Sequence, residues 1–171
     1  LQDYPIRSQS FAAANVAWTA QRRGAQMPFI YSVAAHVSDS ELFAEAGAGW
    51  AGERMRSLGA NSVKANQVVM GGEMAGQVLV AFEVDTADSA MALNAAIYGD
   101  GDLVGLLRDA GVQVERRSLM RIQAEFGTRD ASHATVLYVA GQPVDDETAE
   151  TNFTRNWNHT VSYTHLTLPT T

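Results

Sequence analysis

The order of strand-like and helix-like patterns between residues 29 and 126 is the feature that most constrains the fold of this chain. The segment FIYSVAAHV, Phe29–Val37, alternates so that its most apolar side chains share one face, which is typical of a half-buried strand. A helical pattern follows. It opens with SDSE, Ser38–Glu41, which predicts a capping box, and it stops at Gly59. The chain therefore begins with a strand and then a helix.

The same two patterns recur further along the chain. We expect strands over Asn61–Met70, Gln77–Asp85 and Val112–Phe126, and helices over Ala87–Tyr98 and Leu103–Asp109. Asp85 or Thr86 is the expected cap of the first of these two helices. The order β-α-β-β-α-β predicts an α+β, ferredoxin-like fold, in which both helical segments cover one face of an antiparallel four-stranded sheet.

The first two elements of this order, a strand and then a helix, are predicted again further along the chain. SHATVLYVA, Ser132–Ala140, predicts another strand, and a helix is expected to open at DDET. With one residue inserted near Pro143, Trp50 aligns with Trp157, and each Trp lies twelve positions after its cap. This pattern predicts a first ferredoxin-like copy over 27–127 and a truncated second copy over 131–159, which is half of a tandem α+β barrel.

Both ends of the chain look foreign to this fold. The segment VSYTHLTLPT, Val161–Thr170, resembles a translated sequencing adapter, so we expect residues 160–171 to be adapter-derived rather than part of the fold. Residues 1–26 precede Met27 and show no sustained apolar period. They are either a translated leader or a disordered arm.

Composition disfavours several classes of partner and chemistry. The chain has 171 residues, of which twelve are basic and nineteen acidic, and its net charge of −7 disfavours nucleic acid or an anionic membrane as the main partner. Because there is no cysteine, disulfides and thiolate chemistry are excluded. Four scattered histidines and two glycine-containing turns give no metal or nucleotide spacing, so no cofactor is expected. Without an apolar spanning run or a signal pattern, a cytoplasmic protein is expected.

Tandem ferredoxin-like units of this length resemble the dimeric α+β-barrel superfamily. It includes the antibiotic-biosynthesis monooxygenase-like, Dabb, EthD-like and NIPSNAP-like families. The resemblance covers Met27–His159 and rests on the element order, on FEVDTADSAMALNAA as a strand running into a helix, and on the tandem copy. It implies sheets that pair into a barrel, self-association through the sheet, and a pocket for a small hydrophobic ligand.

Polar side chains on the less apolar strand faces are the candidates for chemistry. Our candidate catalytic residues are His36 and Arg121, because histidine titrates near neutral pH and a nearby carboxylate can orient it. The candidate pocket residues are Ser32, Glu83, Gln123, Glu125 and Trp50. In the alternative interpretation, Arg121 and Glu125 are solvated or paired across the sheet, His36 ends a strand in solvent, and Trp50 belongs to the core.

Two functions stay open at this point. One is a cofactor-independent oxygenase, isomerase or cyclase that acts on a small hydrophobic substrate. The other is a non-catalytic binding or structural barrel. A cavity that touches His36 and Arg121 would favour the enzyme, and a closed apolar interior with His36 at its rim would favour the binding or structural protein.

Overall fold

A computed structural model describes residues 28–125, 134–138 and 140–164. Contacts divide the chain into two units, one of which spans Gln26–Ile122, while the other includes the chain from Gln123 onward. The predicted leader over 1–26 and the end of the predicted adapter segment, 165–171, lie outside the described residues.

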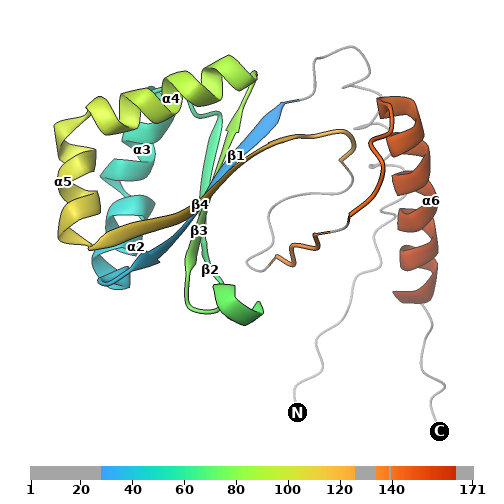
Figure 1. The fold of residues 1–171 in the computed structure, drawn as a ribbon, viewed down its shortest axis with the longest axis horizontal. Helices are drawn as coiled ribbons and strands as arrows, with labels where there is room; N and C mark the ends of the chain where they lie inside the picture. Colours follow the sequence, from blue (N-terminus) through green and yellow to red (C-terminus); the bar gives the residue numbers. More distant parts are fainter. Residues whose placement is uncertain (1–27, 126–133, 139, 165–171) are drawn as a thin grey trace, which may run out of the picture. The chain divides into compact units, whose positions relative to one another are not determined.

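The first unit contains the predicted ferredoxin-like fold (Figure 1). Its elements are β1 Phe29–Val37, α2 Ser40–Ala48, α3 Trp50–Ser57, β2 Ser62–Gln67, the 3₁₀ turn η1 Gly72–Met74, β3 Val78–Val84, α4 Ala87–Gly99, α5 Gly101–Asp109 and β4 Val112–Arg121. The strands pair antiparallel in the order β2-β3-β1-β4. This order confirms the β-α-β-β-α-β prediction.

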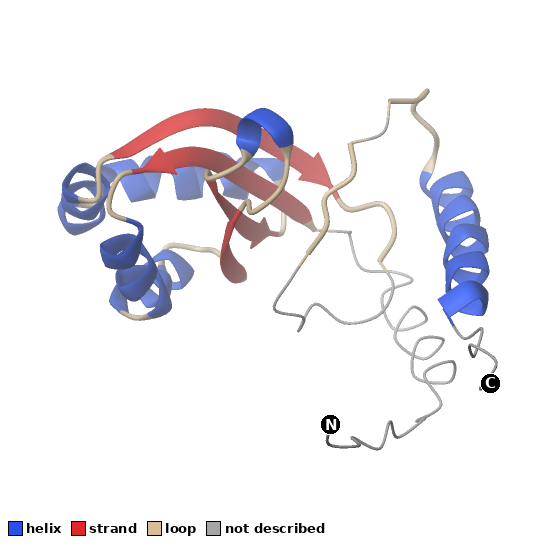
Figure 2. Ribbon diagram, turned by 90° about the horizontal axis from the view of Figure 1, so that it is seen from below, coloured by secondary structure: helices blue, strands red, loops and turns tan. Residues whose placement is uncertain are grey.

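The core lies between one face of the sheet and the helices (Figure 2). Tyr31 of β1 lies opposite Phe82 of β3, and their rings stack with centroids 5.9 Å apart. Leu93 of α4 is 1% exposed, and burying a side chain of this size contributes about 1.5–3 kcal/mol. The sequence correctly predicts which face of β1 and β3 packs against the helices, because the apolar residues of both strands alternate with period two.

The first helical segment differs from its prediction at both its start and its middle. Asp39, rather than Ser38, caps α2, and its Oδ1 accepts a hydrogen bond of 2.9 Å from the backbone N–H of Leu42. The segment also breaks at Gly49 into α2 and α3. A side chain at Gly52 would clash with the backbone carbonyl of Gly47, so the bend brings the two backbones into close contact.

A β-bulge interrupts the pairing of β1 with β4. Ala34 lies opposite Arg116 and Ala35 lies opposite Val114, so Glu115 has no partner in the ladder. A bulge of this kind places two residues opposite one and reverses the alternation beyond it. As a result Arg117, which lies opposite Val33, faces the helices.

Among the described residues of the second unit, the helix matches its prediction; residues 132, 133 and 139 of the predicted strand lie outside them. The helix α6, Asp146–Thr164, begins where predicted, and Oδ1 of Asp145 accepts from the N–H of Thr148 at 2.8 Å. Residues 134–138 are not in a strand, so the predicted strand is wrong for them. The helix also extends over 161–164, the first residues of the segment that resembles an adapter.

The predicted equivalence of the two tryptophans is not supported. Trp50 is the first residue of α3, directly after the break at Gly49, whereas Trp157 lies inside the uninterrupted helix α6. Both side chains are exposed, at 47% and 38% respectively. Neither tryptophan is therefore a core residue of its unit.

Substitutions at two glycines, Gly111 and Gly72, test the close contact between the start of β4 and the loop after β1. Gly111 and Gly72 have nearly the same backbone φ, +62° and +59°. A Cβ at Gly111 would lie 2.7 Å from Oγ of Ser38, whereas a Cβ at Gly72 meets nothing within 4 Å. We expect Gly72→Ala to cost about 1–2 kcal/mol in the free energy of unfolding, the cost of the left-handed conformation alone.

Gly111→Ala should cost more, because the backbone N–H groups of Ser38 and Asp39 both donate to the carbonyl of Ala110 and hold the loop in place. Urea unfolding of both variants measures the difference. Equal losses would show that the loop yields to the added methyl group.

Candidate functional site

The sequence-predicted catalytic pair does not assemble. Arg121 lies opposite Phe29 and therefore shares the helix-facing side of the sheet, whereas His36 lies opposite Gln113 on the other side. His36 is exposed near the end of β1. The prediction that His36 and Arg121 share a face is wrong, and the bulge at Glu115 is the reason.

Two other predicted pocket residues, Ser32 and Glu83, lie on the face of the sheet that carries His36, but Glu83 is far from His36. Ser32 is 7% exposed in the middle of the sheet, opposite Ala81. Glu83 lies opposite Ile30, six positions from His36 along β1, which corresponds to about 20 Å in a strand. The carboxylate of Glu83 accepts a hydrogen bond of 3.5 Å from the Ser62 hydroxyl.

The last two predicted pocket residues lie beyond the end of β4, which stops at Arg121 rather than at Phe126. Both Gln123 and Glu125 belong to the second unit. The side-chain Nε2 of Gln123 donates to the carbonyl oxygen of Val144 at 3.1 Å and to Oδ1 of Asp146 at 3.2 Å. These contacts join Gln123 to the start of α6 and not to a pocket in the sheet.

A cavity of about 80 Å³ lies instead on the helix-facing side of the sheet. Most of its lining comes from aliphatic and aromatic side chains of β1, β3, β4 and the helices: Val33, Ala35, Val37, Phe43, Met55, Val78, Val80, Phe82, Ile97, Leu103, Leu106, Leu107, Val112 and Val114. Its polar lining residues are Tyr31, Asn94 and Tyr98. An apolar wall with a few polar groups is the usual character of a small-molecule site.

The polar lining residues form a cluster with Arg117, which we call the Tyr31 cluster (Tyr31, Asn94, Tyr98 and Arg117). The Tyr31 hydroxyl donates to Oδ1 of Asn94 at 2.8 Å. An Nη of Arg117 donates to the Tyr98 hydroxyl at 2.6 Å, and the guanidinium carbon lies 5.6 Å from the centre of the Tyr98 ring. Asn94 and Tyr98 are four residues apart on α4, a spacing that places both side chains on one face of a helix.

The electrostatics of the cluster keep Tyr31 neutral and Arg117 charged. Burial raises the pKa of Tyr31 above its ordinary value of 10.0, and the charge of Arg117 opposes this effect. The hydrogen bond to Tyr98 raises the pKa of Arg117. At neutral pH the cluster therefore offers a protonated phenol and a permanent cation.

The sequence contains a partial signal for this cluster. The alternation of side chains along β1 places Tyr31 on the helix side of the sheet. The spacing of Asn94 and Tyr98 places these two residues on one face of α4. Arg117 was not predictable from alternation, because strict period two from Val112 puts it on the opposite face. The unpaired Glu115 reverses that parity.

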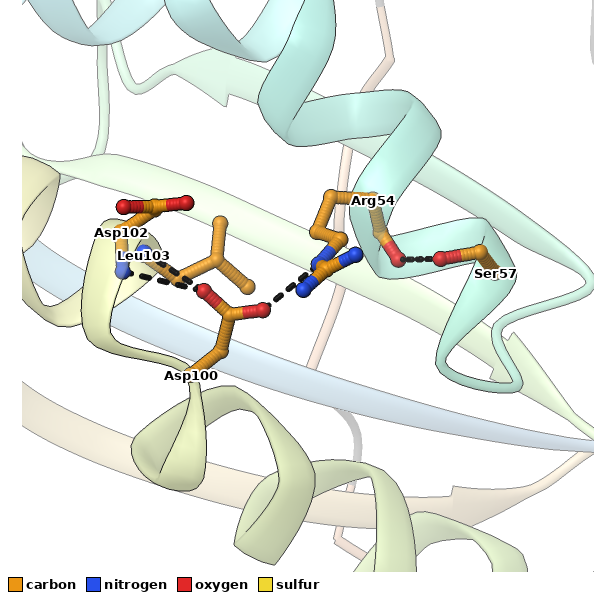
Figure 3. Close-up of polar contacts among 5 residues, drawn as sticks. All are labelled: Arg54, Ser57, Asp100, Asp102 and Leu103. Atoms are coloured by element: carbon orange, nitrogen blue, oxygen red, sulfur yellow. Dashed lines mark hydrogen bonds and ion pairs between the residues drawn. The ribbon is translucent and has the colours of Figure 1, made fainter.

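A second buried polar contact joins α3 to the junction of α4 and α5 (Figure 3). The side chain of Asp100 is only 6% exposed. Its Oδ1 accepts from the backbone N–H groups of Asp102 and Leu103, both at 3.1 Å, and its Oδ2 accepts from Nε of Arg54 at 2.6 Å. Because both oxygens are occupied by N–H donors, this aspartate caps α5 and anchors α3. We assign it a structural role.

Neither a metal cluster nor a membrane span is found in the described parts of the chain. Within residues 28–125, 134–138 and 140–164, no three His, Cys, Asp or Glu side chains gather as metal ligands. In the same ranges no helix has the length and apolar character needed to cross a bilayer.

The fold and the site together define an α+β protein with a split βαβ sheet and an apolar cavity under its helices. No known protein family and no curated protein matches the chain. Among solved structures it is similar to a dimeric ferredoxin-like protein from an uncultured marine organism, at 16% identity and a TM-score of 0.40, over 57% of this chain and 98% of that one. The fold assignment rests on the strand order of the chain itself.

Removing the Tyr31 hydroxyl tests the cluster. We expect Tyr31→Phe to lower the free energy of unfolding near pH 7 by about 1 kcal/mol, because Oδ1 of Asn94 loses its donor. In the unchanged protein, the contribution of Tyr31 is full below pH 10.0 and is lost as pH rises through the higher pKa of the folded state.

Urea unfolding at about pH 7 and above pH 10 measures both effects. The Tyr31→Phe variant should lose less stability at high pH than the unchanged protein. Tyr138→Phe, at an exposed tyrosine of the second unit, is the control and should match the unchanged protein. If Tyr31→Phe loses as much stability at high pH as the unchanged protein does, the assignment is contradicted.

The Asp100 contact predicts the opposite pH dependence. The hydrogen bond from Arg54 holds the pKa of Asp100 below its ordinary value of 3.8, so its stabilising contribution is present above that pH and is lost as pH falls through the folded-state pKa. Asp100→Asn keeps a capping oxygen but removes the charge.

We expect Asp100→Asn to be less stable than the unchanged protein near neutral pH and to lose less stability on acidification. Thermal unfolding at about pH 6 and pH 3 measures this. Asp109→Asn, which removes an exposed contact with Arg108, is the matched control. The assignment fails if Asp100→Asn and Asp109→Asn behave alike.

Proposed function

We propose that the first unit binds a small, mainly apolar molecule in the cavity between its sheet and its helices. The observation that carries this proposal is the apolar lining of the cavity, which ends at the hydrogen-bonded pair of Tyr31 and Asn94. Cavities with apolar walls stay free of ordered water and accept apolar ligands, whereas polar groups at one end orient them.

The size of the cavity limits the ligand. A water-sized group occupies about 10–15 Å³ of a cavity, so a cavity of about 80 Å³ holds roughly five to eight non-hydrogen atoms. This corresponds to a short aliphatic chain or a single small ring. A larger polycyclic substrate would require the helices to move away from the sheet.

The groups that line the cavity favour a binding function over a catalytic one. Among the described residues that line it, the titratable groups are the phenols of Tyr31 and Tyr98. The pKa of Tyr31 is raised by burial, so this phenol donates a hydrogen bond at neutral pH and is a poor base. His36, our candidate base, lies on the other face of the sheet. The oxygenase, isomerase or cyclase function is therefore the second candidate.

The proposed relation to the dimeric α+β-barrel families also stays a prediction. The face of the sheet that carries Ser32 and His36 is not covered by the helices of this unit, which all pack on the opposite face (Figure 1). Self-association through this face is the arrangement that the resemblance implies. It would leave the cavity intact, because the cavity lies on the helix side.

A cavity-filling substitution tests the proposal. Ala35 lines the cavity, so Ala35→Leu should fill it and abolish binding of 1-hexanol, measured by calorimetry and by amide chemical shifts in NMR spectra. Because the added carbons enter existing space, we expect the free energy of unfolding to change by less than about 1.5 kcal/mol.

Ala81→Leu is the matched control, because Ala81 lies opposite Ser32 on the other face of the sheet. This variant should bind 1-hexanol like the unchanged protein. The proposal is overturned if the unchanged protein binds neither 1-hexanol nor hexanoate, a carboxylate of the same chain length. It is also overturned if Ala35→Leu binds 1-hexanol as well as the unchanged protein does.

A further inference from the structure

The polar end of the cavity has more hydrogen-bond donors than acceptors. The Tyr31 hydroxyl donates to Oδ1 of Asn94, which leaves the side-chain NH₂ of Asn94 with no partner among the described residues. The Tyr98 hydroxyl accepts from Arg117, so its own proton is available for donation. A ligand group that accepts hydrogen bonds therefore fits this end.

Beside this end of the cavity lies a positive charge, on the exposed side chain of Arg117, which is not itself a lining residue. Within the residues that the structure describes, the contacts of Arg117 are to the phenols Tyr98 and Tyr31, and none is to a carboxylate. By comparison, Arg54 and Arg108 are each paired with an aspartate. A guanidinium offers a planar fork of N–H groups, of which one is used by Tyr98.

From these two observations we infer that the ligand of the proposed site is a small carboxylate with a short apolar chain. The chain fills the cavity, and the carboxylate lies at the Tyr31 cluster, where it accepts from Arg117 and from the Asn94 amide. The inference rests on the proposed function, because it names the chemical class of the molecule that the cavity binds. Charge-assisted hydrogen bonds from arginine to carboxylate are roughly twice as strong as neutral ones.

Three probes of matched length test this inference on the full chain: hexanoate, 1-hexanol and hexylamine. Isothermal titration calorimetry should give a dissociation constant for hexanoate at least about tenfold lower than that for 1-hexanol, with hexylamine the weakest of the three. In Arg117→Gln, the affinity for hexanoate should fall to about that for 1-hexanol, and the affinity for 1-hexanol should fall less.

Arg116→Gln is the matched control. It removes the same charge from the neighbouring position of β4, but Arg116 lies opposite Ala34 on the other face of the sheet. This variant should keep the preference for hexanoate. Arg117→Lys should restore part of it, because lysine supplies the charge without the planar fork.

Tyr98→Phe provides a second measurement that keeps Arg117 in place. It removes the hydroxyl to which Arg117 donates, and the preference for hexanoate should persist or increase. A preference that survives in Arg117→Gln would overturn the assignment to Arg117. Equal binding of hexanoate and 1-hexanol by the unchanged protein would overturn the carboxylate class but leave the proposed function standing. Binding of neither probe would overturn the proposed function itself.

Discussion

The burial of one face of β1 is the constraint on which the rest of the first unit depends. This strand pairs on one edge with β3 and on the other with β4. Its helix-facing residues therefore decide which side chains of both neighbours meet α4 and α5. Tyr31 and Val33 are central to this face, and the Tyr31 hydroxyl makes a polar contact with Asn94 of α4 next to the cavity. The position of the cavity follows directly from the pleat of β1.

The bulge at Glu115 turns a side chain toward the helices that regular pairing would turn away from them. Without it, the alternation of β4 from Val112 would turn Arg116 rather than Arg117 toward the helices. With it, Arg117 joins Val33 on the helix side and reaches Tyr98. Bulges often re-aim side chains near functional sites, and here the bulge places an exposed guanidinium beside the polar end of an apolar cavity. One unpaired residue thus sets the charge of the proposed site.

The sequence predicted the fold much better than the site. Alternation in β1 and β3 is a local signal that the structure confirms. The helix cap was predicted at Asp85 or Thr86, and it is Thr86, whose hydroxyl oxygen accepts from the N–H of Ser89 at 3.0 Å. The Gly49 break and the cap at Asp39 depend on how helices pack and where a loop is held, and local patterns do not encode these. The predicted catalytic pair was wrong because strict alternation, when it is extended past a bulge, assigns every later residue to the wrong face of the sheet.

The polar cluster also accounts for why a cavity exists in such a small core. Unsatisfied buried polar groups cost about 1–3 kcal/mol each, so Tyr31 and Asn94 are held at hydrogen-bond distance and α4 cannot approach β1 more closely there. Behind them, Ala35 and the valines of β4 are too small to fill the remaining space. The apolar surface that faces this space is left unburied, at a cost of about 25 cal/mol per Å². A ligand that fills the void offsets this cost, so the stability of the unit and its proposed binding function are thermodynamically linked.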